Sequence, residues 1–290
     1  MIKFVCAAMF FLAYCQSVDA QSLYEPEEIH KKAPAVPAYS VFAGDTVRFD
    51  RQDFYERMDR ELISFTYMHT NTTLMLKRSA RYFAIVEPIL KREGIPDDFK
   101  YLMAIESNLD PKALSAAGAA GIWQVVKSTA QAHGLVVDSE VDERYNVEKE
   151  TVVACEYFRE AYEKFGDWIT VAASYNAGQN GIQRRLESQR QDTALELWMM
   201  EETSRYIFRL LAVKMLFADP AAFGFDVKPS DMYPYVPPRT TVTVSGPIPS
   251  LVDFAEEHGV TYAALKQANL WLRSDKLTNK SGRTYSIAIP

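Results

Sequence analysis

Apolar residues in the middle of the chain recur three and four positions apart, which is the spacing of an amphipathic helix. Phe54, Met58, Leu62 and Phe65 are the first residues that follow this spacing. The pattern also predicts helices from Pro96 to Asn108 and over residues 74–90, 147–165 and 193–217. Strict alternation of apolar and polar positions is nearly absent before residue 235. The pattern therefore predicts a main domain, over residues 51–225, that is mainly α.

The chain changes character on both sides of this domain. Residues 21–50 contain three prolines and few large apolar residues, and predict an extended lead-in. Residues 226–240 contain four prolines and predict a semi-rigid linker. In the remaining segment, alternation over 240–244 and 284–289 predicts two strands, and residues 250–258 and 262–269 follow the helical spacing. Residues 241–290 are therefore predicted to form a small β-α-α-β domain.

The first twenty residues have the layout of a secretory signal peptide. Lys3 precedes an apolar run over residues 4–14, and Val18 and Ala20 are small residues suited to cleavage before Gln21. We therefore expect an exported protein of the periplasm or cell envelope. The alternative is a lipoprotein anchored to the outer membrane through Cys15, although Tyr14 is bulky where that processing needs a small residue. If the signal peptide is cleaved before Gln21, Cys155 is the one remaining cysteine, and its helical context favours a packed apolar residue over a nucleophile.

Charge and residue types exclude several classes of function. The 290 residues carry a net charge of −6, which argues against a nucleic-acid-binding protein, because such proteins need a basic face. The four histidines show no i,i+4 pair, and neither CxxC nor HExxH occurs. We expect no metal ion and no organic cofactor.

A single glutamate stands out at the end of the helix predicted to begin near Pro96. Phe99, Leu102 and Met103 precede Glu106 by seven, four and three positions, so helical spacing places them on the same face. A carboxyl group among apolar side chains has a raised pKa, and a protonated carboxyl group near neutral pH can act as a general acid. The alternative is a helix-end glutamate that points into solvent.

The segment that follows this glutamate consists largely of small residues. Residues 113–121 are all Ala, Ser or Gly except Leu114, and small side chains allow close approach of an extended ligand. Tight packing of the chain against itself is the alternative. A phosphate-binding loop is excluded, because Gly118 and Gly121 lack the G-x-G-x-x-G spacing and no strand precedes them.

Three motifs in this region resemble those of the family 1 lytic transglycosylases, the goose-lysozyme-like enzymes that cleave peptidoglycan. They are Glu106-Ser107 with Pro111, Ala113, Ser115, Gly118-Ala119, Gly121 and Trp123-Gln124; Ser174-Tyr175-Asn176-Ala177-Gly178; and Glu202-Thr203 followed by Tyr206. They occur in the family's order and spacing over roughly residues 75–220. The resemblance implies a lysozyme-like domain preceded by extra helices.

The overall pattern is most similar to the membrane-bound D type of this family, which adds LysM modules at the C-terminus. Residues that match the LysM pattern are Ala255, Gly259-Val260, Leu265, Asn269, Leu277 and the closing segment 287–290. The usual Gly-Asp-Thr-Leu opening is replaced by Gly246-Pro247-Ile248-Pro249-Ser250. The resemblance implies a LysM-like fold, and this departure concerns its affinity for glycan.

The resemblance implies peptidoglycan glycan strands as the partner and a reaction without water, in which Glu106 is the sole general acid and base. Ser115 and Gln124 would bind the sugars, Tyr206 would orient Glu106 or the N-acetyl group, and Tyr175 and Asn176 would line the cleft. The sequence has Val125-Val126-Lys127 where relatives often have Phe-Met-Pro.

Two alternatives remain open at this point. One is a lysozyme-type hydrolase on the same fold, with Asp110, Asp142 or Glu202 activating a water molecule. The other is a non-catalytic peptidoglycan-binding protein that uses the groove and the LysM-like domain to hold glycan.

Overall fold

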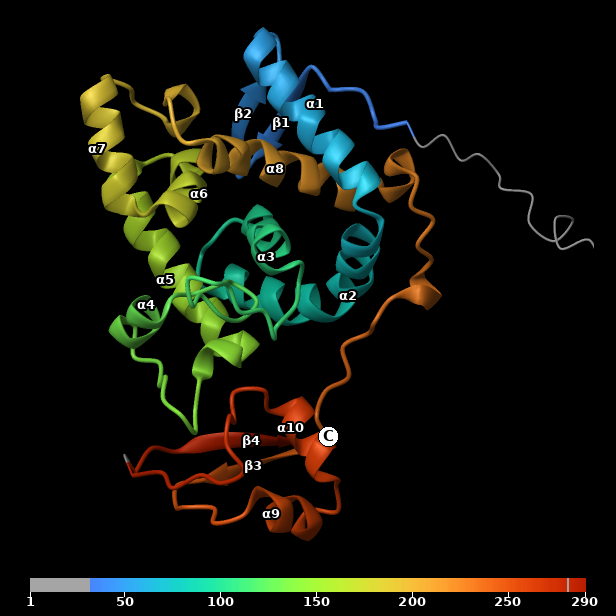
Figure 1. The fold of residues 1–290 in the computed structure, drawn as a ribbon, viewed down its shortest axis with the longest axis vertical. Coiled ribbons are helices and arrows are strands. Elements are labelled where there is room, and N and C mark those ends of the chain that lie inside the picture. Colours follow the sequence, from blue (N-terminus) through green and yellow to red (C-terminus); the bar gives the residue numbers. More distant parts are fainter. Residues whose placement is uncertain (1–31, 281) are drawn as a thin grey trace, which may run out of the picture. The chain divides into compact units, whose positions relative to one another are not determined.

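The computed structural model describes residues 32–280 and 282–290, and these are mainly α-helical, as expected (Figure 1). The signal peptide and Cys15 lie outside the described residues. In chain order the helices are α1 (Gln52–Tyr67), α2 (His69–Arg92), α3 (Lys100–Ser107), α4 (Lys127–Ala132), α5 (Val147–Phe165), α6 (Trp168–Ala177), α7 (Gln179–Gln189), α8 (Glu201–Ala218), α9 (Leu251–Glu257) and α10 (Tyr262–Ala268). The strands are β1 (Tyr39–Phe42), β2 (Asp45–Arg48), β3 (Thr240–Val244) and β4 (Tyr285–Ile289).

The predicted extended lead-in differs from the structure over residues 39–48, which form an antiparallel hairpin. Strand β1 pairs with β2, and the two residues between them, Ala43 and Gly44, have φ of 53° and 98°. Such a two-residue turn with positive φ matches the twist of a hairpin. Phe42 and Val47 are buried in the main core, and the Ala43 N–H donates to the carboxylate of Asp98. The hairpin is therefore anchored by contacts distant in sequence, which a local pattern does not reveal.

Helix α5 forms over the residues that the periodicity predicted. The Asn146 side chain caps its first turn by accepting from the Lys149 N–H, and Gly166 ends it with φ of 67°. Its inward face places Cys155 and Phe158 in the core, both with 0% exposure. Burial raises the pKa of the Cys155 thiol to about 12, so this side chain packs as a small apolar group and is no nucleophile at neutral pH.

Helices α1 and α8 lie side by side (Figure 1). Between them Glu61, 0% exposed, accepts from Arg205 at 2.6 Å and from Arg209 at 3.2 Å. A buried carboxylate is stable only when its charge is compensated, and two guanidinium groups from α8 compensate this one. The pairing fixes how α8 rests on α1.

The helix predicted over 193–217 was wrong in its first eight residues. Residues 194–196 form a 3₁₀ turn, residues 197–200 are non-helical, and α8 begins at Glu201. Thr193 caps the short turn through its hydroxyl, which accepts from the Leu195 N–H. The backbone of Trp198 instead bonds the Gln189 side chain, donating to Oε1 at 2.7 Å and accepting from Nε2 at 2.9 Å. These bonds replace the helical ones.

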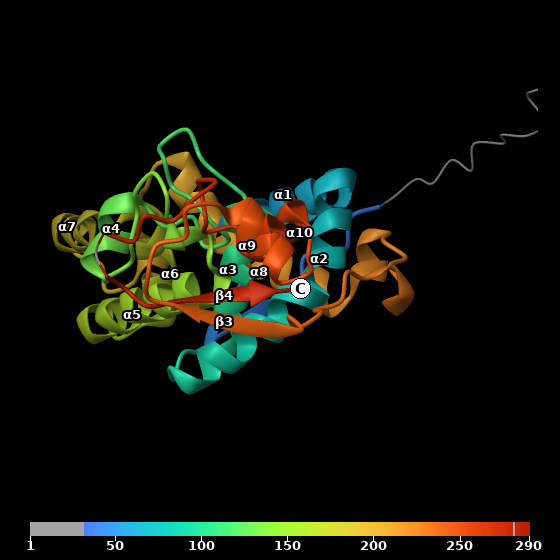
Figure 2. The same ribbon diagram turned by 90° about the horizontal axis from the view of Figure 1, so that it is seen from below.

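The C-terminal segment has the predicted β-α-α-β order. Strand β3 pairs antiparallel with β4 from Thr240 opposite Ile289 to Val244 opposite Tyr285 (Figure 2). Leu251, Leu265 and Ile287, each 0% exposed, contribute to its own apolar core.

This segment also bonds directly to the main domain, and Lys32–Pro290 form one compact unit. Val141 and Leu272 form an isolated antiparallel bridge. The Asp142 N–H donates to the Trp271 carbonyl at 2.9 Å, and the Glu140 carboxylate accepts from the Thr278 N–H at 2.7 Å. The small domain is therefore attached by main-chain bonds as well as by the preceding linker.

Asn269 tests whether the C-terminal domain depends on its buried polar link. This side chain, 1% exposed, donates to the carbonyls of Leu265 and Ala288 and accepts from the Ala288 N–H at 2.9 Å. Asn269→Ala leaves these groups unpaired in the interior. We expect it to lower the free energy of unfolding of this domain by about 1–3 kcal/mol. Hydrogen exchange of β4 amides measures this, and the exposed Glu257→Ala is the control. Equal protection in the two variants would contradict the assignment.

Candidate active site

Glu106 lies on the last turn of α3. This helix packs next to α8 (Figure 1). Asn108 ends the helix in the left-handed conformation with φ of 58°, so the chain turns away directly after this residue. Phe99, Leu102 and Met103 are all 0% exposed, as helical spacing predicted. Glu106 itself is partly exposed. The carboxyl group therefore has an apolar surround on the helix side and retains access to solvent.

A tyrosine one hundred residues later contacts this carboxyl group. The hydroxyl of Tyr206, on α8, donates to Oε1 of Glu106 at 2.6 Å. Desolvation raises the pKa of Glu106 to about 7, and the hydrogen bond from Tyr206 acts in the opposite direction. The desolvation effect is larger, so a substantial fraction of Glu106 is protonated at neutral pH.

Two charged residues on the same helix adjust this pKa further. The charge of Glu202 raises the pKa of Glu106, and the charge of Arg209 lowers it. The sequence analysis missed Arg209. Its signal was spacing, because Glu202, Tyr206 and Arg209 are four and three positions apart and share one face of α8. The Glu61 carboxylate pairs with the Arg209 guanidinium and so partly compensates the charge that lowers the pKa of Glu106.

Ser115 and Gln124 brace the loop of small residues that follows α3. The Ser115 hydroxyl accepts from the Ala119 N–H at 3.0 Å. The Gln124 amide donates to the carbonyls of Ala113 at 3.2 Å and Gly121 at 2.8 Å. Gln124 has φ of 55°, a conformation that few side chains adopt without such support. Both residues remain partly exposed, so they hold the loop and also face solvent.

A buried carboxylate that sequence reasoning did not identify holds the far end of this loop. Glu150, on α5 and 0% exposed, accepts from the N–H of Ile122 at 2.8 Å and of Trp123 at 3.0 Å. Burial raises its pKa well above the usual value, and these N–H donors oppose that shift. At Gly121, with φ of 86°, a Cβ atom would lie 2.0 Å from the Arg144 carbonyl and 2.4 Å from the Glu150 carboxylate. Only glycine fits there.

Tyr175 connects this loop to α6. Its hydroxyl donates to the Trp123 carbonyl at 2.8 Å, and burial followed by the charge of Glu106 raises its pKa well above the usual value. Trp123 is 0% exposed and donates from Nε1 to the Thr151 hydroxyl, so it packs and offers no surface to a ligand. Asn176 is half-buried, and within residues 32–280 its side chain makes no hydrogen bond. Its amide is free to bind a ligand.

Five of the six predicted site residues fall into two groups, and the Asn176 side chain is bonded to neither. Glu106 and Tyr206 are hydrogen-bonded directly, and the charge of Glu106 acts on Tyr175. Ser115 and Gln124 belong to one braced loop, and no hydrogen bond in the described part of the chain joins either to Glu106.

The three other acids considered from sequence differ in their partners. Asp110 pairs with Arg78 at 3.3 Å, and Asp142 pairs with Arg144 at 2.7 Å. Glu202 is exposed, and no described residue forms a hydrogen bond or ion pair with its side chain. Of these three acids, only Glu202 has an unpaired carboxylate within the described residues, and its charge acts on Glu106.

No group of three His, Cys, Asp or Glu residues in the described ranges is arranged to hold a metal ion. In the same ranges, no helix is both long enough and apolar enough to cross a membrane.

Two family models match this chain. Residues 84–197 match the Transglycosylase SLT domain, and residues 240–290 match the Soluble lytic transglycosylase C-terminal LysM-like domain. The chain therefore carries an SLT domain followed by a LysM-like domain. The first match contains Glu106, the braced loop and the Tyr175-Asn176 segment, and it ends before Tyr206.

Individual relatives agree with the domain matches. The chain is 25% identical over 258 residues to membrane-bound lytic murein transglycosylase D of Escherichia coli, in strain K12 and in strain CFT073. The alignment covers 86% of this chain and 55% of the relative, so the chain spans about half the length of the curated relatives that it matches.

Solved structures of lytic transglycosylases are also similar. An inactive variant of Slt from Pseudomonas aeruginosa is 20% identical, over 52% of this chain and 26% of that chain, with a TM-score of 0.40. The 70 kDa soluble lytic transglycosylase of Escherichia coli is 18% identical, over 64% of this chain and 33% of that chain, with a TM-score of 0.43.

The raised pKa of Glu106 predicts a stability effect that depends on pH. A carboxyl group whose pKa is higher in the folded state than the usual value stabilises the fold at low pH, and this contribution is lost as pH rises through about 7. Glu106→Gln is neutral at every pH. Wild type therefore loses stability between pH 4 and pH 8, and the variant does not. We expect the free energy of unfolding of the variant minus that of wild type to be larger at pH 8 than at pH 4 by about 1–3 kcal/mol. Urea unfolding at both pH values measures this.

The exposed Glu160→Gln is the matched control, because it removes one carboxylate from the surface of α5. If the free energy of unfolding of Glu106→Gln differed from that of wild type by the same amount at both pH values, the result would argue against a desolvated carboxyl group at Glu106.

Proposed function

We propose that this chain, with its SLT and LysM-like domains, is a peptidoglycan lytic transglycosylase. It would cleave the β-1,4 bond between MurNAc and GlcNAc without water and leave a 1,6-anhydromuramic acid end. The observation that carries this proposal is Glu106, whose pKa of about 7 and hydrogen bond from Tyr206 suit a group that gives and takes one proton. The domain matches and the D-type relatives support the same activity.

Glu106 acts twice in this reaction. In its protonated form it donates its proton to the glycosidic oxygen, the bond from C1 to that oxygen breaks, and the GlcNAc side leaves with a free hydroxyl. The resulting carboxylate accepts the proton of the MurNAc 6-hydroxyl, whose oxygen bonds to C1. Glu106 ends protonated, so the cycle needs no second proton donor. A pKa near the working pH serves both steps.

The remaining site residues hold the substrate and the acid. Tyr206 orients the Glu106 carboxyl group through its hydroxyl, and its bond favours the carboxylate formed after the first step. Asn176 offers a free amide to an N-acetyl group or a hydroxyl. Ser115 and Gln124 present partly exposed polar groups on a loop that Glu150 and Tyr175 keep rigid. Rigid donors cost little ordering entropy when a flexible polymer binds.

A hydrolase is the second candidate, and Glu202 is the observation that favours it. The side chain is exposed and unpaired within the described chain, and its charge reaches Glu106. A water molecule activated by Glu202 would give a reducing end in place of the anhydro end. In either case the substrate is the glycan strand. We propose that residues 241–290 form a module that holds this strand, and that the protein is located in the cell envelope. A purely binding role is disfavoured by the protonatable Glu106.

The product of digestion tests the reaction class. Purified wild-type protein incubated with intact sacculi is expected to release muropeptides lighter by one water than their hydrolytic counterparts, as measured by mass spectrometry. Glu106→Gln is expected to lower turnover by about 10²–10⁴-fold or more, since it cannot transfer a proton, while it retains affinity for glycan. Glu202→Gln keeps the anhydro product if Glu106 works alone. Release of reducing-end products by wild type would instead establish the hydrolase.

The pH dependence of turnover tests the link between Tyr206 and Glu106. The acid form of Glu106 is required, so turnover is expected to fall as pH rises through about 7. Tyr206→Phe removes a hydrogen bond that lowers the pKa of Glu106. The pH at which turnover declines should therefore be higher in this variant. Its kcat should also fall, because the carboxyl group is less well oriented. Tyr162→Phe, on the exposed side of α5, is the control. If turnover of Tyr206→Phe declined at the same pH as that of wild type, the hydrogen bond from Tyr206 would not set the pKa of Glu106.

A further inference from the structure

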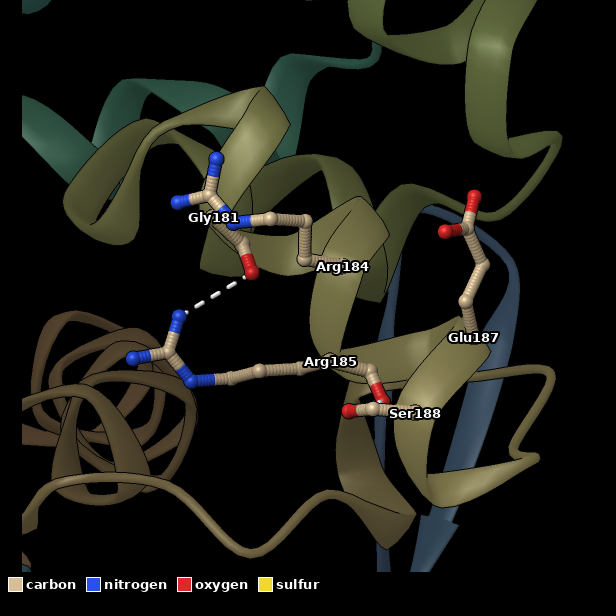
Figure 3. Close-up of a pocket in the computed structure, with 5 residues that line it drawn as sticks. All are labelled: Gly181, Arg184, Arg185, Glu187 and Ser188. Atoms are coloured by element: carbon tan, nitrogen blue, oxygen red, sulfur yellow. Dashed lines mark hydrogen bonds between the residues drawn. The ribbon is translucent and has the colours of Figure 1, made fainter.

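Helix α7 carries a polar row on one face. Gly181, Arg185 and Gln189 are four positions apart and therefore line up along the helix over about 12 Å. The Arg185 guanidinium donates to the Gly181 carbonyl at 3.0 Å. Figure 3 shows the guanidinium groups of Arg184 and Arg185 on one side of the helix, with the Glu187 carboxylate on the other. These residues, with Ser188, line a shallow open pocket.

The two arginines of this pocket carry uncompensated charge. Neither Arg184 nor Arg185 forms an ion pair with any described carboxylate, although the chain as a whole is acidic with a net charge of −6. Glu187 is bonded to Gln183 at 2.6 Å instead. Guanidinium groups without an ion-pair partner favour carboxylate or phosphate ligands, which they bind with two parallel hydrogen bonds.

An exposed tryptophan adjoins the end of the same row. The Trp198 side chain is 84% exposed, whereas Leu197 beside it is 3% exposed. Both backbone groups of Trp198 bond the Gln189 side chain at 2.7 and 2.9 Å. The backbone is thus fixed and the large apolar ring is directed outward. A fixed, exposed indole offers a flat face to an apolar surface such as that of a sugar ring, at low entropic cost.

Helix α7 is close in sequence to residues of the candidate active site. It starts directly after the segment of Tyr175 and Asn176, and Trp198 precedes Glu202, whose charge acts on Glu106, by four residues.

We propose that Arg184, Arg185 and Trp198 form an accessory binding surface for a glycan strand that carries carboxylate groups. Trp198 stacks on a sugar ring, and the two arginines bind carboxylates of the peptide stems attached to the strand. The surface pairs an apolar ring with cations. A neutral glycan would not require the cations, and an acidic peptide would not require the ring, so a glycan that carries carboxylates fits both. The inference rests on the proposed function for the identity of the polymer. A second copy of this chain is the other occupant, and the test separates the two.

The full-length chain with Glu106→Gln provides binding without turnover. Two probes are used: soluble glycan strands that keep their peptide stems, and neutral oligosaccharides of β-1,4-linked GlcNAc, which carry no carboxylate. Trp198→Ala is expected to weaken binding of both probes about tenfold, and Trp198→Phe should restore much of the loss. Trp198 fluorescence should also change on binding of either probe.

The arginine variants separate carboxylate binding from sugar binding. Arg184→Gln combined with Arg185→Gln is expected to weaken binding of the stem-bearing strands about fivefold and to leave binding of the neutral oligosaccharides unchanged. The difference should shrink at high salt, because it arises from charge.

Met200→Ala is the matched control, since this residue is also apolar, 69% exposed and two positions from Trp198. It should bind both probes as the parent does. Unchanged affinity in Trp198→Ala, or an equal loss in Met200→Ala, would overturn the proposal. A shift from dimer to monomer in Trp198→Ala, with glycan affinity retained, would assign the surface to self-association.

The proposed function has a separate test, which is digestion of sacculi by the wild-type chain. If wild type cleaves glycan while the Trp198 and arginine variants bind both probes normally, this inference fails and the proposed function remains.

Discussion

The proposed reaction depends on one constraint, which is that a carboxyl group must keep its proton near neutral pH and still reach solvent. Glu106 meets it at the end of α3, where apolar side chains remove water from one side and the Tyr206 hydroxyl contacts the other. Desolvation raises the pKa and the hydrogen bond lowers it, so the value of about 7 is a balance of opposing effects. Helix α8 must therefore be held in place, and the buried pairing of Glu61 with Arg205 and Arg209 does this from α1.

The same logic explains the loop of small residues. A loop of small side chains has little apolar surface to hold it in one conformation. Polar bonds replace packing: Glu150 binds two consecutive N–H groups, Gln124 binds two carbonyls, and Tyr175 binds a third. Gly121 permits the close approach that these bonds require. Hydrogen bonds from residues distant in sequence therefore hold this loop in one conformation.

Local patterns predicted the elements that local forces determine. Helix α5 and strand β3 have the predicted bounds, because apolar spacing and capping residues are encoded within each segment. The hairpin over 39–48 and the start of α8 were not predicted. The first is anchored by Asp98 and the second is displaced by Gln189, and both partners lie outside the segments they shape. Glu150 was missed for a similar reason, since on α5 it looks like any helical glutamate.

The sequence by itself determined the helical class of the main domain, the order of the C-terminal elements and the position of an acid on an apolar helix face. These follow from periodicity, which is a property of neighbouring residues. Only the tertiary structure decided that Tyr206 and not another side chain meets Glu106, that Asp110 and Asp142 are neutralised by arginines while Glu202 is left free, and that Trp198 faces solvent. Each depends on which distant groups share a low-dielectric interior, and residue spacing along one chain does not specify that.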